Sequence, residues 1–182
     1  MRAHLRLSGY DEDSVVAAAI SAAVNLIEEE TRRALITQTW RASISCEWAE
    51  NDRIWLPRPR LIAITSVEYW NSVDAWVEHD VANYRVASDS EPAGLWLTDT
   101  PADLGTSDFE DSSLWRVTYT AGYGPTPNEV PDALRAAIKL LAAHLFENRE
   151  AMVIGNTVAM ALPIGIDRLI APFRVPWGGT NL

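Results

Sequence analysis

The residues of this chain that could do chemistry do not form a recognised catalytic pattern. Nucleophilic catalysis needs a Ser, Cys or Thr beside an oriented base, but the sequence contains no G-x-S-x-G nucleophile elbow. The single cysteine, Cys46, lies on the apolar side of an alternating run that predicts a strand. His144 lies three residues after Leu141 on a predicted apolar helix, which favours a core or subunit-contact histidine. We therefore predict that the protein is not an enzyme.

The other candidates give neither a metal site nor a nucleotide site. Three histidines and one cysteine have no zinc-ligand spacing, so we expect no metal and no cofactor. Gly122-Tyr123-Gly124 lacks the spacing of a phosphate-binding loop and runs into prolines, which offer no N–H to a phosphate. The acid pairs Asp11/Asp13 and Glu110/Asp111 have no EF-hand ladder around them. A hydrolase that uses such a pair is a less favoured alternative to solvated carboxylates.

Helical periodicity occurs at both ends of the chain. The first helix is predicted from about Asp11 to Arg33, with a core stripe of Val16, Ile20, Ala23 and Ile27. A second apolar row lies beside this stripe and predicts that the helix packs against more than one neighbour. This row is formed by Val15, Ala19, Ala22 and Leu26. Later helices are predicted from Pro131 to about Glu150, and over residues 164–173.

Between the helices the apolar period changes to two, which predicts strands with one buried face. The first strand starts at Thr37 and carries Trp40, Ala42, Ile44, Cys46 and Trp48 on its apolar side. Six shorter strands are predicted at residues 54–56, 61–70, 75–78, 84–86, 95–97 and 114–120.

These elements predict an α+β fold. A helical core of a long N-terminal helix, a long C-terminal helix and a short last helix receives an inserted small antiparallel β-sheet or sandwich. The predicted parts are residues 1–36 and 125–174 for the core, 37–124 for the β-rich region and 175–182 for a flexible partner-binding tail.

Composition and charge exclude several classes of protein. The 182 residues, 48% hydrophobic and 22% charged, suffice for one domain or for a core with an inserted subdomain. No apolar run approaches the ~20 residues of a membrane-spanning helix, so we expect no membrane association. The formal net charge of -10 disfavours a nucleic-acid reader that neutralises many phosphates. Nine acids lie between Asp89 and Asp132, with Arg116 as the one base.

Five segments occur in an order that is more specific than any one of them. They are 33–40 (RALITQTW), 54–59 (IWLPRP), 117–124 (VTYTAGYG), 130–150, where Val-Pro opens a helix that closes in HLFENRE, and 166–174 (IDRLIAPFR). In this order they resemble the head-to-tail connector (adaptor) proteins of long-tailed bacteriophages, prophages and gene transfer agents. The resemblance covers most of the chain, whereas residues 71–113 match nothing in that family.

The resemblance implies a structural virion protein. Such proteins form a ring, typically of twelve subunits, under the portal, joining the DNA-filled head to the tail and letting DNA pass without specific binding. The implied partners are further copies of the chain, the portal protein and a tail-side stopper or tail-terminator protein. The implied location is the head-tail junction of the virion, after synthesis in the cytoplasm of a bacterial host.

Three sets of residues are predicted to serve this role. Portal or partner binding is assigned to the tail and the residues before it: Phe173, Arg174, Val175, Pro176 and Trp177. Helix faces between subunits are assigned to Ala137, His144 and Arg149. An acidic lining of the DNA channel, whose charge would repel phosphates at close approach, is assigned to Asp103, Asp108, Glu110 and Asp111.

The high tryptophan content supports an alternative function. Eight Trp residues could belong to an aromatic-rich carbohydrate- or receptor-binding module, a monomer or trimer whose exposed indoles bind sugar. Trp40 and Trp48 are explained by core packing, whereas Trp70, Trp76 and Trp177 are predicted as interface anchors in loop or tail settings. We favour the connector because the alternative does not explain the ordered segments.

Overall fold

The computed structural model describes residues 12–45, 53–105, 113–148 and 164–175. The chain forms two compact units. The helical unit contains residues 1–32 and 127–174, and the β unit contains residues 33–126 and 175–182. The chain thus changes from one unit to the other at residues 32/33, 126/127 and 174/175, where the sequence placed boundaries at 36/37, 124/125 and 174/175.

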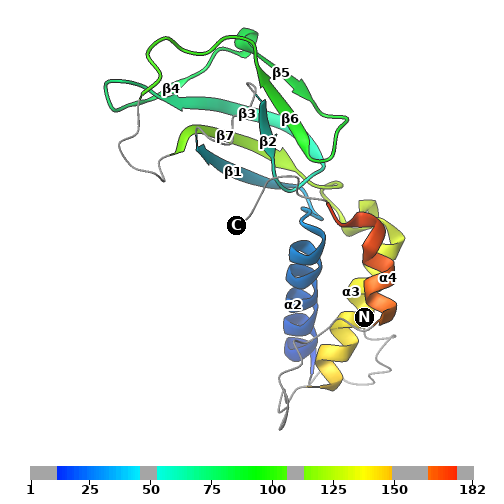
Figure 1. The fold of residues 1–182 in the computed structure, drawn as a ribbon. Coiled ribbons are helices and arrows are strands. Elements are labelled where there is room, and N and C mark those ends of the chain that lie inside the picture. The colour runs from blue at the N-terminus through cyan, green and yellow to red at the C-terminus, as the bar shows by residue number, and fades with distance from the viewer. Residues whose placement is uncertain (1–11, 46–52, 106–112, 149–163, 176–182) are drawn as a thin grey trace, which may run out of the picture. The chain divides into compact units, whose positions relative to one another are not determined.

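The helical unit is built from α2 (Asp13–Thr31), α3 (Asp132–Glu147) and α4 (Ile164–Ile170), with a 3-10 turn at Ala171–Phe173. Within it α2 packs against α3, and α3 packs against α4 (Figure 1). Together with the strands below, these helices confirm the predicted α+β class.

Helix α2 ends at Thr31, and the next residue, Arg32, caps it. The N–H of Arg32, which has a left-handed backbone (φ 54°), donates to the carbonyls of Glu28 and Glu29. At the preceding residue, the Thr31 hydroxyl donates to the Ile27 carbonyl at 2.6 Å. The buried stripe differs slightly from the predicted one, because Ala19 is buried in place of Ile20, which is half-buried.

Helix α3 buries one face in the core of the helical unit. Pro131 lies just before the helix, with its fixed φ and without an N–H to satisfy. The buried residues of α3 are Leu134, Ala137, Leu141 and Ala142. From α4, Ile166 and Ile170 are buried as well.

The β unit contains two antiparallel sheets. The four-stranded sheet has the order β1 (Gln38–Ser45), β7 (Ser113–Ala121), β3 (Leu61–Trp70), β4 (Trp76–Glu78). The three-stranded sheet has the order β2 (Arg53–Leu56), β6 (Ala93–Leu97), β5 (Tyr84–Ala87). The seven strands of the described residues overlap the predicted ones, and every pairing between these strands is antiparallel.

One apolar cluster joins the two sheets. Alternate residues of the four-stranded sheet point inward, including Ile44, Val67, Trp115, Val117 and Tyr119. The three-stranded sheet contributes Ile54, Leu56, Leu95 and Leu97. The predicted alternation on β1 is confirmed, since Ile44 is buried while Arg41 and Ser43 are exposed. Cys46 and Trp48, predicted on the same side, lie outside the described residues.

Short 3-10 turns lie at Val81–Asn83, before β5, and at Pro127–Glu129, before α3. Among the residues described, none of the helices combines the length and apolar character required to cross a lipid bilayer.

Leu134→Ala is expected to destabilise the helical unit by roughly 2–5 kcal/mol, because it empties a fully buried position of α3. Urea unfolding followed by far-UV circular dichroism measures this loss. Lys139→Ala, at an exposed position of the same helix, is the matched control and should change stability little. Equal stabilities of the two variants would contradict the packing described.

Candidate functional site

Three segments that are distant in the sequence meet where β1 begins, β7 ends and β2 turns into β3. We call residues 33–37, 57–60 and 121–124 the three-segment junction. Backbone bonds join its members: Gly122 N–H to Arg60 O (2.9 Å), Tyr123 N–H to Leu35 O (3.1 Å) and Thr37 N–H to Gly124 O (2.9 Å). A further bond runs from the Ala34 N–H to the Pro59 carbonyl (3.3 Å). Three of the five segments that carried the family resemblance therefore form one hydrogen-bonded unit.

Gly122 makes this close approach possible. Its φ is +140°, a backbone conformation that favours glycine. A Cβ at this position would lie 2.7 Å from the carbonyl carbon and oxygen of Ile36, inside contact distance. Gly122-Tyr123-Gly124 is therefore a structural turn, as the sequence predicted when it excluded a nucleotide loop.

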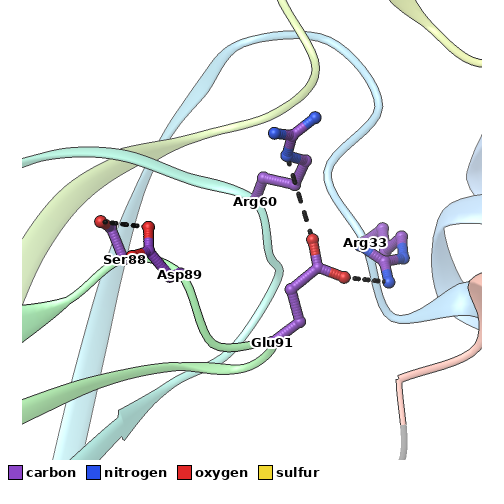
Figure 2. Close-up of polar contacts among 5 residues, drawn as sticks. All are labelled: Arg33, Arg60, Ser88, Asp89 and Glu91. Carbon is purple, nitrogen blue, oxygen red and sulfur yellow. Dashed lines mark hydrogen bonds and ion pairs between the residues drawn. The ribbon is translucent and has the colours of Figure 1, made fainter.

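Glu91, in the turn between β5 and β6, holds two arginines of the junction (Figure 2). Its Oε2 lies 2.5 Å from Arg33 Nη2, and its Oε1 lies 3.9 Å from Arg60 Nε. The Arg33 side chain is 8% exposed, so its charge is largely removed from water and depends on this carboxylate. Figure 2 also shows Asp89, which accepts the Ser88 hydroxyl at 3.4 Å and is exposed.

Aromatic side chains fix the Pro57–Arg60 part of the junction. The Tyr119 hydroxyl donates to the Pro57 carbonyl at 2.5 Å, and burial raises the pKa of Tyr119, which keeps it a donor. The Arg58 guanidinium lies 5.1 Å from the ring centre of Trp40. Burial also raises the pKa of Tyr123, whose ring centre is 6.0 Å from the Arg60 guanidinium.

The junction has the chemistry of a clamp. Its side chains form ion pairs, cation–π contacts and one tyrosine hydrogen bond, and it presents no nucleophile beside a base. Within the described ranges, no three His, Cys, Asp or Glu side chains lie close enough together to hold a metal ion.

The structure ties the start of the predicted tail to the helical unit. Arg174 Nη2 lies 3.0 Å from Glu30 Oε2 and 2.9 Å from Asp167 Oδ1, and these hydrogen bonds raise the pKa of Arg174. Phe173 is half-buried and Val175 is buried. Pro176 and Trp177, the other members of this set, lie outside the described residues.

The residues predicted for subunit contacts differ in exposure. Ala137 is fully buried inside its own helical unit, so its methyl group has no surface left for a neighbouring subunit. His144 is exposed near the end of α3, with its Nδ1 3.3 Å from Asn148 Nδ2. Arg149 lies beyond the described part of α3.

Of the predicted acidic channel lining, the structure describes one residue. Asp103 is exposed, and its Oδ1 accepts the Tyr69 hydroxyl at 3.0 Å. Asp108, Glu110 and Asp111 lie outside the described residues.

Sequence reasoning missed a bidentate ion pair on the four-stranded sheet. Arg116 donates through Nε (2.9 Å) and Nη2 (2.6 Å) to the two carboxylate oxygens of Glu68, and its guanidinium lies 4.3 Å from the ring centre of Trp76. Glu68 and Arg116 face each other across β3 and β7, and only this strand register brings them together. The only indication of this pair in the sequence was that Arg116 is the one base in the acidic region from Asp89 to Asp132.

Four tryptophans of the β unit form ring contacts within the chain. Trp70 and Trp76, expected in loops, are paired across β3 and β4 with ring centres 5.3 Å apart. Trp55, which is 38% exposed, and Trp96 are tilted by 60° and share the guanidinium of Arg53, at 4.8 and 4.3 Å. A sugar-binding platform needs free indole faces, whereas the Arg53 guanidinium lies over part of both of these rings.

Comparisons with known proteins agree with the five-segment resemblance. Residues 106–174 match the family described as Phage gp6-like head-tail connector protein. This range contains β7, α3 and α4, together with three of the five segments in full. No curated protein matches the chain.

Solved structures match nearly the whole chain. A chain in the neck of an empty gene transfer agent (GTA) particle with C6 symmetry is 25% identical, with a TM-score of 0.75 and coverage of 99% of this chain and 90% of that one. A chain in the virion of a native GTA particle is also 25% identical, with a TM-score of 0.73 and coverage of 98% and 89%. A chain in the neck of a native GTA particle with C12 symmetry shares the fold, at 23% identity, a TM-score of 0.71 and coverage of 99% and 92%. The predicted resemblance is thus confirmed.

Glu91→Gln is expected to destabilise the β unit by roughly 1–3 kcal/mol, because it removes the carboxylate charge from the nearly buried guanidinium of Arg33. Urea unfolding followed by tryptophan fluorescence measures the change. Asp89→Asn, an exposed carboxylate two residues away, is the control and should cost little. The clamp is refuted if the two variants are equally stable.

Glu68 should make the β unit sensitive to acid. Its hydrogen bonds to Arg116 lower its pKa in the folded state. The stabilisation is therefore complete above the ordinary Glu pKa of about 4.3 and is lost as the pH falls through the lowered value. Glu68→Gln should flatten the fall in stability over that range, measured as the urea midpoint between pH 6 and 3. Glu78→Gln, an exposed acid on β4, is the control, and equal pH profiles for both variants would contradict the assignment.

Proposed function

We infer that this chain is a head-tail connector, a structural protein of a virion. The observation that carries this conclusion is the fold shared over nearly the full length with a chain of a GTA neck, at 25% identity. The match of residues 106–174 to a head-tail connector family supports it independently of the fold. The three-segment junction agrees with this role, since its side chains clamp strands and carry no arrangement for catalysis.

The connector acts as a homo-oligomeric ring in the neck, with twelve subunits as the proposed number. The neck structures with C6 and C12 symmetry support a ring, because their chains repeat around one axis. A ring of identical subunits needs two different patches on each subunit. A chain with both a helical and a β unit has the separate surfaces that such contacts require.

DNA passes through the ring without specific binding. The net charge of -10 supports this proposal, because a lumen with excess carboxylates repels phosphates at close approach. We assign the lining to Asp103, Asp108, Glu110 and Asp111. Asp103 is exposed, as this assignment requires.

The C-terminal tail binds the portal, and a tail-side stopper or terminator binds the opposite face of the ring. The anchoring of Arg174 to Glu30 and Asp167 supports the first assignment, because it fixes the point from which the tail leaves the helical unit. Phe173 and Trp177 are the proposed aromatic contacts, and Pro176 limits the freedom of the chain between them. His144 and Arg149 remain the proposed subunit contacts of α3.

The purified protein should form a closed ring of about twelve subunits, alone or when mixed with its portal. Native mass spectrometry and negative-stain imaging at high protein concentration test this expectation. A chain that stays monomeric and ignores the portal would contradict the connector function.

Deletion of residues 176–182 should leave the fold intact and abolish portal docking. The deletion must spare Val175, because this side chain is buried and its loss would disturb the fold itself. Trp177→Ala should weaken docking at least tenfold, as expected for an aromatic anchor. Trp55→Ala, at an exposed indole of the β unit, is the matched control. Normal docking of the truncated chain would show that the tail does not bind the portal.

A further inference from the structure

Helix α2 carries an exposed apolar stripe beside its buried one. Positions i, i+3, i+7 and i+11 lie on one face of a helix, and here they are occupied by apolar residues. Val15 is 36% exposed and Leu26 is 40% exposed, with the exposed Ala18 and Ala22 between them. The alanines let another helix approach closely, while Val15 and Leu26 supply apolar area at the two ends of the stripe.

The stripe is separate from the face that α2 uses within its own unit. That face consists of Val16, Ala19, Ala23, Ile27 and Thr31, all buried. None of the elements described in the helical unit covers the stripe, since its four residues stay exposed when α2 packs on α3. Helix α2 also touches α4, and its second apolar face stays exposed beside both neighbouring helices.

Helix α3 has an outward apolar face of the same kind. Leu140 is 42% exposed and is the large apolar residue of this face. Around it on the same side of the helix lie the half-buried Ala133 and Ala136 and the exposed His144. A leucine flanked by alanines complements a stripe of alanines flanked by Val and Leu.

The charges of the two helices favour contact of the α2 stripe with α3 over contact with a second α2. Helix α2 contains four acids and no Lys, Arg or His between Asp13 and Thr31. Two copies of α2 packed on each other would place like charges together, which costs free energy. Helix α3 carries the bases Arg135 and Lys139 beside the acids Asp132 and Glu147, so contact between α2 and α3 of different copies brings fewer like charges together than contact between two copies of α2.

We propose that the exposed stripe of α2 packs on the Leu140 face of α3 of a second copy of this chain. The contact is heterologous, because each subunit presents α2 to one neighbour and α3 to the other, and such contacts close into rings. The inference rests on the proposed function and specifies which surfaces of the helical unit join adjacent subunits.

Cysteine cross-linking tests the pairing in assembled particles. In a Cys46→Ser background, Ala22→Cys and Leu140→Cys are introduced singly and together into cells that produce the particles. A short bismaleimide is added, and purified particles are analysed under denaturing conditions. The double variant should give a ladder of covalent multimers that ends at the ring, while each single variant stays monomeric. Ala17→Cys with Leu140→Cys is the matched control, because Ala17 is exposed on a different side of α2.

Two outcomes would overturn the inference. Dimers from Ala22→Cys alone would mean that α2 packs on α2. Tailed particles whose double variant gives no multimers, or no more than the Ala17 control, would mean that another partner or another part of this chain covers the stripe. The function is tested separately in the same cells: if tailed particles form normally after deletion of the gene, the connector role itself fails.

Discussion

The β unit depends on the close approach of backbones at Gly122. Because no side chain lies between Gly122 and the Ile36 carbonyl, the start of β1, the end of β7 and the loop between β2 and β3 can share backbone hydrogen bonds. These bonds fix where the first and last strands of the unit begin and end. From this point β1 pairs with β7 in one continuous register as far as Ile44 and Trp115, whereas the pairing of β7 with β3 shifts at Leu61/Ala63 and Ile64/Ser66. Tyr119, Val117 and Trp115 of β7 lie in the core.

The charges of the β unit are arranged to support the same framework. An acidic chain has few bases to place, yet Arg33 and Arg60 meet at Glu91, and Arg116 binds Glu68 with both arms of its guanidinium. Each pair joins segments far apart in the sequence. Such pairs contribute to stability mainly where burial strengthens them, which is the case for Arg33 more than for the exposed Arg60.

The helical unit follows a different principle, since its stability comes from apolar stripes. Helix α2 buries one stripe against α3 and leaves a second at the surface. In the proposed pairing, a ring of identical subunits would bury this face at every contact. The same unit anchors Arg174, so the elements suited to subunit contacts and the residue just before the C-terminal tail belong to one compact body.

The sequence by itself determined the elements of this protein and the family that it resembles. Periods of 3.6 and 2, with proline and glycine between them, located α2, α3, α4 and all seven strands to within a few residues, because these signals are local. The order of five short segments identified the family resemblance.

Only the tertiary structure decided which residues meet. The pairs Arg33–Glu91 and Arg116–Glu68 span 58 and 48 residues, and no local pattern indicates such contacts. The sequence also did not indicate which apolar residues are exposed. Ala137 and Leu140 are both apolar residues of one helix, yet the first is buried and the second is at the surface. Whether an apolar residue belongs to the core or to an interface depends on which other elements cover it, and that depends on the packing of the whole unit.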